Sequence, residues 1–135
     1  MQAGSQNKFA MTVFESIADF EAYMPTGGHR GDFFFVRNNN LLTKVMLYEI
    51  QWVSADGNYC VIQTDSKKFA VKVSLKKLSE RLPAMDFIQI HKSHIARLEG
   101  IESVDIKEHI VTISGQSLPL GRTYKDALLA RLEVL

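Results

Sequence analysis

Hydrophobic and polar residues follow two different periods in this chain, and the period changes near residue 31. In the first part, apolar residues recur at three- and four-residue steps, with acidic residues between them. This spacing predicts an amphipathic helix over residues 9–24, which Pro25 would end. The apolar positions of this helix are Phe9, Val13, Ile17, Phe20 and Met24.

Beyond residue 31, short aromatic, aliphatic and β-branched runs follow one another at spacings of roughly ten residues, which is typical of β-strands joined by turns. Turn-forming residues separate the runs, as in the asparagines at 38–40 and the Ala-Asp-Gly-Asn stretch at 55–58. The predicted strands are residues 33–37, 41–46, 49–54, 59–64, 69–73, 87–91, 95–98, 101–106, 111–113 and 117–120.

Two segments of this second part break the strand pattern. Over residues 74–82, Ser74 can cap a short helix, three leucines share one face, and Pro83 closes it. A second helix is expected from about Thr123 to the C-terminus. The pattern therefore predicts a mainly β, antiparallel domain over residues 32–135, preceded over residues 1–31 by a lead, the amphipathic helix and a linker.

Composition narrows the class of protein. A chain of 135 residues suits one domain with its own core, and no apolar run approaches the ~20 residues that span a bilayer. The N-terminus lacks the features of a secretory signal, and the single cysteine, Cys60, excludes an internal disulfide. We expect a soluble cytoplasmic domain with no membrane partner.

The charge is small in total but unevenly distributed. The net charge is +1, yet residues 67–99 contain eight Lys or Arg against three Asp or Glu, which is +5 for that stretch. Such a stretch can attract phosphates, and its lysines can equally be the solvated face of an ordinary domain. On charge alone, DNA binding is the minority reading.

Residues with catalytic or metal-binding chemistry do not form a motif. His91 and His94 are three apart, and in a continuous strand they would point to opposite faces, so we expect no metal site. Ser93 has no nucleophile elbow around it, and Cys60 fits a small core residue. We therefore expect neither an enzyme nor a bound cofactor.

Polar side chains suited to DNA lie at three predicted turns or strand ends. Arg and Lys can donate to guanine, Asn can pair with adenine, and hydroxyls suit phosphates. The same residues are also common in turns, and the pattern alone favours that plainer reading. These residues are Asn58 and Tyr59, Lys92 and Ser93, and Arg122 and Thr123.

From about Phe33 to the C-terminus, the chain resembles the LytTR DNA-binding domain of bacterial response regulators. The most specific segments are FIQIHKSHI at residues 87–95 and LPLGRTY at residues 118–124. The resemblance implies an elongated fold of short strands with small helices, whose loops enter successive major grooves. It also implies double-stranded DNA with repeated half-sites as the partner, bound by pairs of the chain.

Carried over by position, the resemblance implies base contacts from Asn58, Tyr59, Lys92 and Arg122. His91 and Ser93 would hold their loop or touch phosphate, and Thr123 would support the loop beside Arg122. Lys76 and Lys77, from the basic stretch, would attract the DNA backbone.

The sequence departs from the family at two places. Gln89 stands where the family often has Arg, and Ala96-Arg97 stands where it often has Val-Asn. Arg97 is expected to replace the contact of that Asn to the DNA backbone or a loop. The departures and the near-neutral charge leave an alternative, a protein-interaction or scaffold domain of the same fold that has lost DNA binding.

Overall fold

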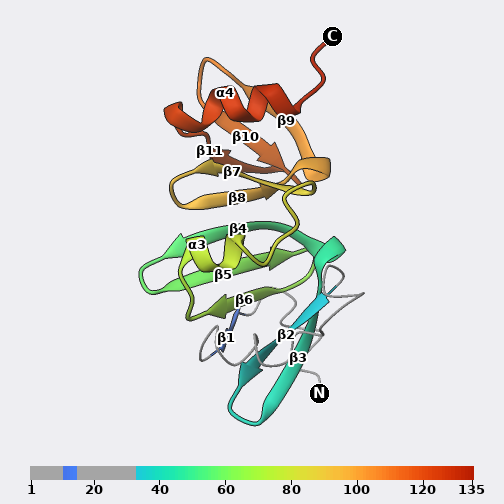
Figure 1. The fold of residues 1–135 in the computed structure, drawn as a ribbon, viewed down its shortest axis with the longest axis vertical. Coiled ribbons are helices and arrows are strands. Elements are labelled where there is room, and N and C mark those ends of the chain that lie inside the picture. Colours follow the sequence, from blue (N-terminus) through green and yellow to red (C-terminus); the bar gives the residue numbers. More distant parts are fainter. Residues whose placement is uncertain (1–10, 15–32) are drawn as a thin grey trace.

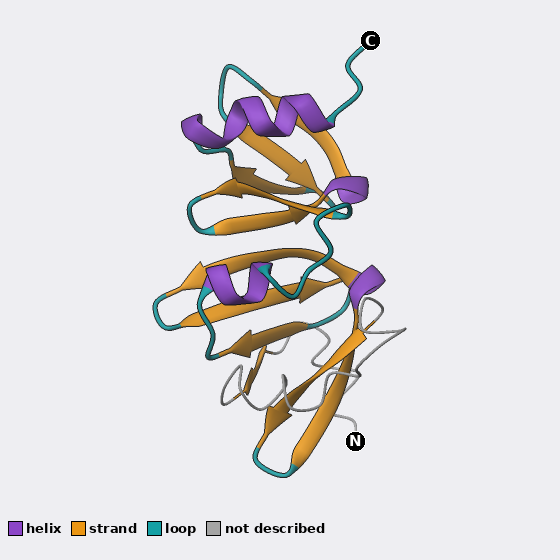
Figure 2. Cartoon of the chain, viewed as in Figure 1, coloured by secondary structure: helices purple, strands orange, loops and turns teal. Residues whose placement is uncertain are grey.

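The computed structural model describes residues 11–14 and 33–135. It is elongated, and strands make up most of it (Figure 1 and Figure 2). The strands are β1 (Met11–Phe14), β2 (Phe33–Asn38), β3 (Leu41–Met46), β4 (Ile50–Asp56), β5 (Tyr59–Thr64), β6 (Lys68–Val71), β7 (Phe87–His91), β8 (His94–Arg97), β9 (Ile101–Asp105), β10 (Ile110–Ile113) and β11 (Gln116–Pro119). The helices are α3 (Leu75–Ser79) and α4 (Arg122–Arg131), with 3-10 turns η1 (Leu47–Glu49) and η2 (Leu98–Gly100).

The strands form three sheets. One has six strands in the order β1-β6-β5-β4-β8-β7, one has three in the order β11-β10-β9, and β2 pairs with β3. All pairs are antiparallel except β1 with β6. The predicted mainly β, antiparallel class is confirmed, with this one parallel pair as an exception.

The N-terminal helix prediction is wrong for the part of it that the structure describes. Residues Met11–Phe14 form strand β1, which lies along β6 with Val13 opposite Ala70. Thr12, Val13 and Phe14 are β-branched or aromatic, and β6 offers an unpaired edge, so tertiary pairing overrides the helical period. The other residues of the predicted helix lie outside the described residues.

Two hydrophobic cores lie on opposite faces of the central strands. In β4, Val53 packs in the first core while its neighbour Trp52 packs against the second. In β8, Ile95 and Ala96 divide in the same way. Because successive side chains of a strand point to opposite faces, strands β4 and β8 connect the two halves of the molecule.

The first core lies between the six-stranded sheet, the β2–β3 hairpin and α3. Helix α3 begins as predicted, because the Ser74 hydroxyl accepts a hydrogen bond of 3.1 Å from the Lys77 amide. The helix ends at Ser79 rather than reaching residue 82, although Leu82 is buried in the same core as Leu78.

The second core lies between β7–β8, the three-stranded sheet and α4. Leu128 of α4 is fully buried there, beside Val111 and Ile113 of β10. Helix α4 begins one residue before the predicted start, and it lies across the three-stranded sheet (Figure 1). No helix of the described residues is long and apolar enough to cross a membrane.

Four hairpins within residues 33–135 have two-residue turns. Three of these turns contain a residue with positive φ: Asn39 at 56°, Gly57 at 62°, and Ser114 with Gly115 at 51° and 76°. Positive φ matches the twist of antiparallel strands in such tight connections. The β7–β8 turn, Lys92 and Ser93, has no positive φ.

Candidate nucleic-acid interface

The three turn segments singled out in the sequence lie along one edge of the molecule. The β4–β5 turn, the β7–β8 turn and the start of α4 follow one another up the left side of Figure 1. Strands β4, β8 and β7 are neighbours in the sheet, with Ser54 of β4 opposite His94 of β8. The sheet topology therefore brings together segments that are more than 60 residues apart in the chain.

Backbone hydrogen bonds join each segment to the next. The Ala55 amide donates to the Ser93 carbonyl at 2.8 Å, which ties the β4–β5 hairpin to the β7–β8 turn. The Gly121 amide donates to the Ile90 carbonyl at 2.7 Å, which ties the start of α4 to β7. The relative positions of the three segments are thus set by main-chain contacts rather than by flexible side chains.

Gly121 allows α4 to begin close to β7. A Cβ atom at this position would lie 2.8 Å from Cδ2 of Tyr124 and 3.4 Å from Cα of His91. Because the first distance is shorter than a van der Waals contact, any other residue would have to displace the Tyr124 ring. Glycine therefore fixes where Arg122 stands relative to the β7–β8 turn.

Most of the side chains expected to contact bases are exposed to solvent rather than packed in the protein. Asn58, Lys92 and Arg122 are exposed, as is Thr123 beside them. Tyr59 is half-buried, with the Lys72 ammonium 6.0 Å from its ring centroid. Long exposed cationic and amide side chains on a rigid frame suit contacts to base edges and phosphates.

The two histidines of the β7–β8 hairpin face each other, contrary to the expectation of opposite faces. A two-residue turn interrupts the strand, so that His91 and His94 become cross-strand partners. Their rings meet edge to face with centroids 5.4 Å apart. Burial lowers the pKa of His94, and the nearby His91 lowers it further.

Ser93 connects the two histidines. Its hydroxyl lies 3.0 Å from Nδ1 of His91 and 3.0 Å from Nδ1 of His94, and its amide donates to Nδ1 of His91 at 3.1 Å. Among the described residues, no third His, Cys, Asp or Glu joins the pair to form a group that could hold a metal ion.

The sequence singles out Gln89 only as a departure from the family and His94 only as a possible metal ligand, and it assigns neither residue to the candidate interface. The Gln89 amide donates to the carbonyls of His91 and Lys92, at 3.1 and 3.4 Å. Its position two residues before His91 was the available signal, although the β7–β8 pairing shifts register between these two residues. His94 could have been found by recognising Lys92-Ser93 as a hairpin turn.

Lys76 and Lys77 are exposed on α3, which covers the first core beside β4 and β5 (Figure 1). The Lys72 side chain, at the end of β6, is exposed as well. Together they place positive charge near the β4–β5 turn.

Arg97 lies at the other end of β8 and is bonded within the protein. Its Nε donates to the Ile50 carbonyl at 2.7 Å, its Nη2 donates to the Leu47 carbonyl, and its guanidinium stacks on Phe87 at 4.8 Å. This side chain supplies donors to the carbonyls around the 3-10 turn η1, away from the three turn segments.

Cys60 is a core residue, as expected. It is fully buried, its thiol donates to the Val73 carbonyl at 3.2 Å, and burial raises its pKa to about 11. A thiol with this pKa remains protonated and is a poor nucleophile near neutral pH.

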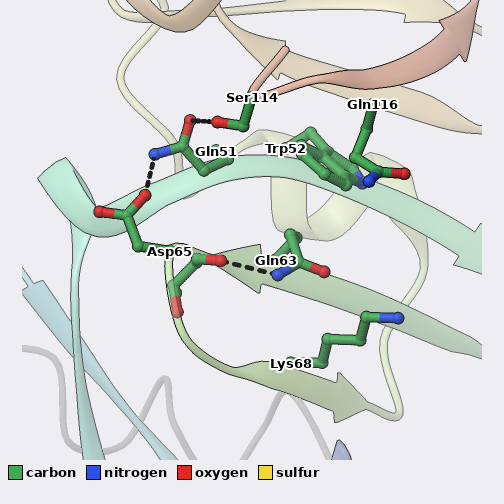
Figure 3. A pocket seen from close by; sticks show the side chains of 8 residues that line it. Gln51, Trp52, Gln63, Asp65, Lys68, Ser114 and Gln116 are labelled. Atoms are coloured by element: carbon green, nitrogen blue, oxygen red, sulfur yellow. Dashed lines mark hydrogen bonds between the residues drawn. The ribbon is translucent and has the colours of Figure 1, made fainter. Parts of the chain in front are cut away.

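A polar pocket of about 370 Å³ lies at the far end of β4 and β5 from these turns (Figure 3). Gln51 crosses it, donating to Asp65 at 2.6 Å and accepting from the Ser114 hydroxyl at 3.3 Å. The Gln63 amide, which is buried, donates to the Thr64 carbonyl at 2.7 Å. The two Gln51 bonds link the β5–β6 turn to the β10–β11 turn and so connect the six-stranded and three-stranded sheets.

Comparison with known proteins connects this arrangement to one family. The profile of the LytTr DNA-binding domain matches residues 41–133. In solved structures, the fold is similar to the LytTr DNA-binding domain of a putative methyl-accepting/DNA response regulator from Bacillus cereus, with a TM-score of 0.65 and 16% identity, covering 74% of this chain and 95% of that one.

A curated relative agrees. The sensory transduction protein LytT of Bacillus subtilis (strain 168) is 22% identical over 90 residues, covering 64% of this chain. The match spans 37% of that protein's length. From residues 41–133 and the shared fold, the chain belongs to the LytTr DNA-binding domain family.

Proposed function

We propose that this chain binds double-stranded DNA sequence-specifically as the output domain of a transcription regulator. The β4–β5 turn, the β7–β8 turn and the start of α4 would together form one reading edge. Asn58, Tyr59, Lys92 and Arg122 would contact bases in successive major grooves. His91, Ser93 and Thr123 would support their segments or touch phosphate.

One observation carries this proposal: three polar segments distant in sequence lie on one edge and are joined by main-chain hydrogen bonds. Base readout needs several donors held in fixed relative positions, because each contact discriminates only when its geometry is met. The exposed Lys92 and Arg122 side chains sit on this joined backbone. Turn residues with no role in base readout would not need main-chain hydrogen bonds between their segments.

The affinity for any DNA sequence would come from nearby lysines. Lys76 and Lys77 are exposed on α3, a helix that contains no acidic residue, and Lys72 is exposed beside the β4–β5 turn. Lysines of this kind bind phosphates, which adds affinity without sequence preference and weakens with salt.

Selection of bound fragments from a random duplex pool tests the proposal. We expect recovery of a defined sequence with two similar half-sites, bound by two copies of the chain. Recovery of no sequence, with no binding to random duplex even at low salt, would contradict it. That outcome would favour the alternative of a scaffold domain that keeps the fold.

The wider setting follows from the relatives. The matched Bacillus subtilis protein is a sensory transduction protein, and the matched Bacillus cereus domain comes from a response regulator. We propose that this chain likewise delivers a signal to transcription in a two-component type of system, in the cytoplasm. Since the family is defined by DNA binding, no enzymatic activity is proposed.

A further inference from the structure

The β7–β8 turn, which displays Lys92, is held in an unusual way. Tight two-residue turns between antiparallel strands favour residues with positive φ, and this turn has none. The other three two-residue hairpin turns of the described chain each have at least one. Side-chain hydrogen bonds therefore have to hold a connection that the backbone alone does not favour.

The main hydrogen bond within the β7–β8 turn is the one that an Asx turn would make. In such a turn, an Asn or Asp side chain accepts a hydrogen bond from the amide two residues later. Here Nδ1 of His91 takes that place and accepts from the Ser93 amide at 3.1 Å. Because a backbone amide can only donate, this Nδ1 must carry a lone pair and no proton.

The Ser93 hydroxyl lies between the two rings. It is 3.0 Å from Nδ1 of His91 and 3.0 Å from Nδ1 of His94. The one lone pair on Nδ1 of His91 already accepts from the Ser93 amide, so the hydroxyl is free to donate to either ring. The network therefore requires the Nε2–H form of neutral His91.

We propose that His91, Ser93 and His94 are positioning residues that hold the Lys92 turn, and that His91 does so only while its Nδ1 is unprotonated. Protonated His91 would point an N–H at the Ser93 amide, which breaks that bond, while the Ser93 hydroxyl can turn to accept from it. Protonated His94 keeps a bond to Ser93, because its Nδ1–H can donate to the hydroxyl oxygen. The consequence for DNA rests on the proposed function: acidification should reduce selectivity for the operator.

The surrounding charges do not offer His91 an acidic partner within its own hairpin. The Gly121 backbone packs against it, with the Tyr124 ring over that glycine. The adjoining elements carry other titratable or charged side chains: Lys92 in the turn, His94 and Arg97 on β8, Arg122, Tyr124, Lys125, Asp126 and Arg131 on α4, and Asp56, Tyr59 and Lys72 around the β4–β5 hairpin.

Simple electrostatics predicts the opposite effect of acid on DNA binding, so an experiment can separate the two explanations. A protonated histidine at a DNA-binding edge attracts phosphates, so binding would strengthen at low pH. The proposed hydrogen-bond network instead predicts that acid weakens the discrimination between operator and random duplex. When the pH is lowered from about 7.5 to about 5.5, the ratio of operator affinity to random-duplex affinity should fall about tenfold.

His91→Asn is the decisive variant, because Asn supplies a similarly placed acceptor that does not titrate. Relative to its own value at about pH 7.5, the operator selectivity of this variant should no longer fall on acidification. His94→Asn should retain the acid dependence. His109→Asn, in the β9–β10 turn where φ is 59°, is the matched control and should behave as wild type.

NMR of the DNA-free protein tests the hydrogen-bond network of His91, Ser93 and His94 independently of any DNA. Long-range ¹H–¹⁵N spectra should show the Nε2–H form of His91, and acid should shift the Ser93 amide. A proton on Nδ1 of His91 at neutral pH, or an unchanged acid dependence in His91→Asn, would overturn the proposal. If no operator is recovered, the proposed function fails, while these spectra still test the hydrogen-bond network.

Discussion

At the scale of single residues, the same chemical type has different roles depending on its backbone. Arg122 and Arg97 are both expected from the sequence to serve DNA binding, yet Arg97 bonds to carbonyls of the protein while Arg122 is exposed at the start of α4. Exposure and bonding therefore separate a reading candidate from a structural arginine, which sequence position does not.

Arg122→Ala tests the reading candidate. Removing one good base contact should cost about 1–3 kcal/mol of operator binding and relax selectivity at one position. Lys107→Ala, an exposed change in the β9–β10 turn, is the control and should change neither. Titration of operator and single-base variants by fluorescence anisotropy measures both effects. Wild-type affinity and selectivity in Arg122→Ala would show that the assigned contact is wrong.

Cys60 gives a prediction about stability and pH. Its raised pKa of about 11 means that folding favours the protonated thiol. This contribution is complete below the unfolded thiol's pKa of about 8.5 and is lost as the pH rises toward about 11. The folded protein should therefore resist a thiol reagent at neutral pH and react fully in denaturant. Rapid labelling of the folded chain would contradict the burial of Cys60.

At the scale of elements, Arg97 fastens β8 to the η1 corner. Arg97→Ala leaves the carbonyls of Leu47 and Ile50 without their donor and should lower the free energy of unfolding by about 2–4 kcal/mol. Arg131 also donates to two carbonyls but is exposed, so Arg131→Ala should cost about 1 kcal/mol or less. Denaturant unfolding compares the two. Equal losses would mean that Arg97 has no special structural role.

The elements also show what sequence pattern can and cannot predict. Alternation and turn residues were sufficient for β2 to β11 and both helices to within a few residues, because those signals are local. The pairing of β1 with β6 joins segments far apart in sequence, and no local period encodes it. The three proposed reading segments were also found locally, whereas their adjacency comes from the sheet order.

The prediction that His91 and His94 lie on opposite faces was wrong for a related reason. An i, i+3 spacing within a strand places His91 and His94 on opposite faces, whereas a turn at Lys92-Ser93 places them opposite each other. The turn lacks Gly and Asn, the usual signals, because side chains hold it.

At the scale of the whole molecule, a net charge of +1 hides a local concentration of lysines. Replacing Lys76 and Lys77 together by Ala should weaken all duplexes alike, and the slope of log affinity against log salt should fall by about 1 for each phosphate that is no longer neutralised. Selectivity should not change. Arg97→Ala should leave this slope at the wild-type value, since its guanidinium is bonded inside the protein. A loss of selectivity in the lysine variant would mean that α3 reads bases.

The central claim is that one edge of the molecule reads DNA through three joined segments. Methylation interference on the selected operator tests it most directly, because methylation of guanine N7 blocks the major groove. We predict interference in two patches about 10 base pairs apart for each half-site, with Arg122→Ala losing one patch and keeping the other. Interference confined to the minor groove, or a pattern unchanged by Arg122→Ala, would contradict this claim.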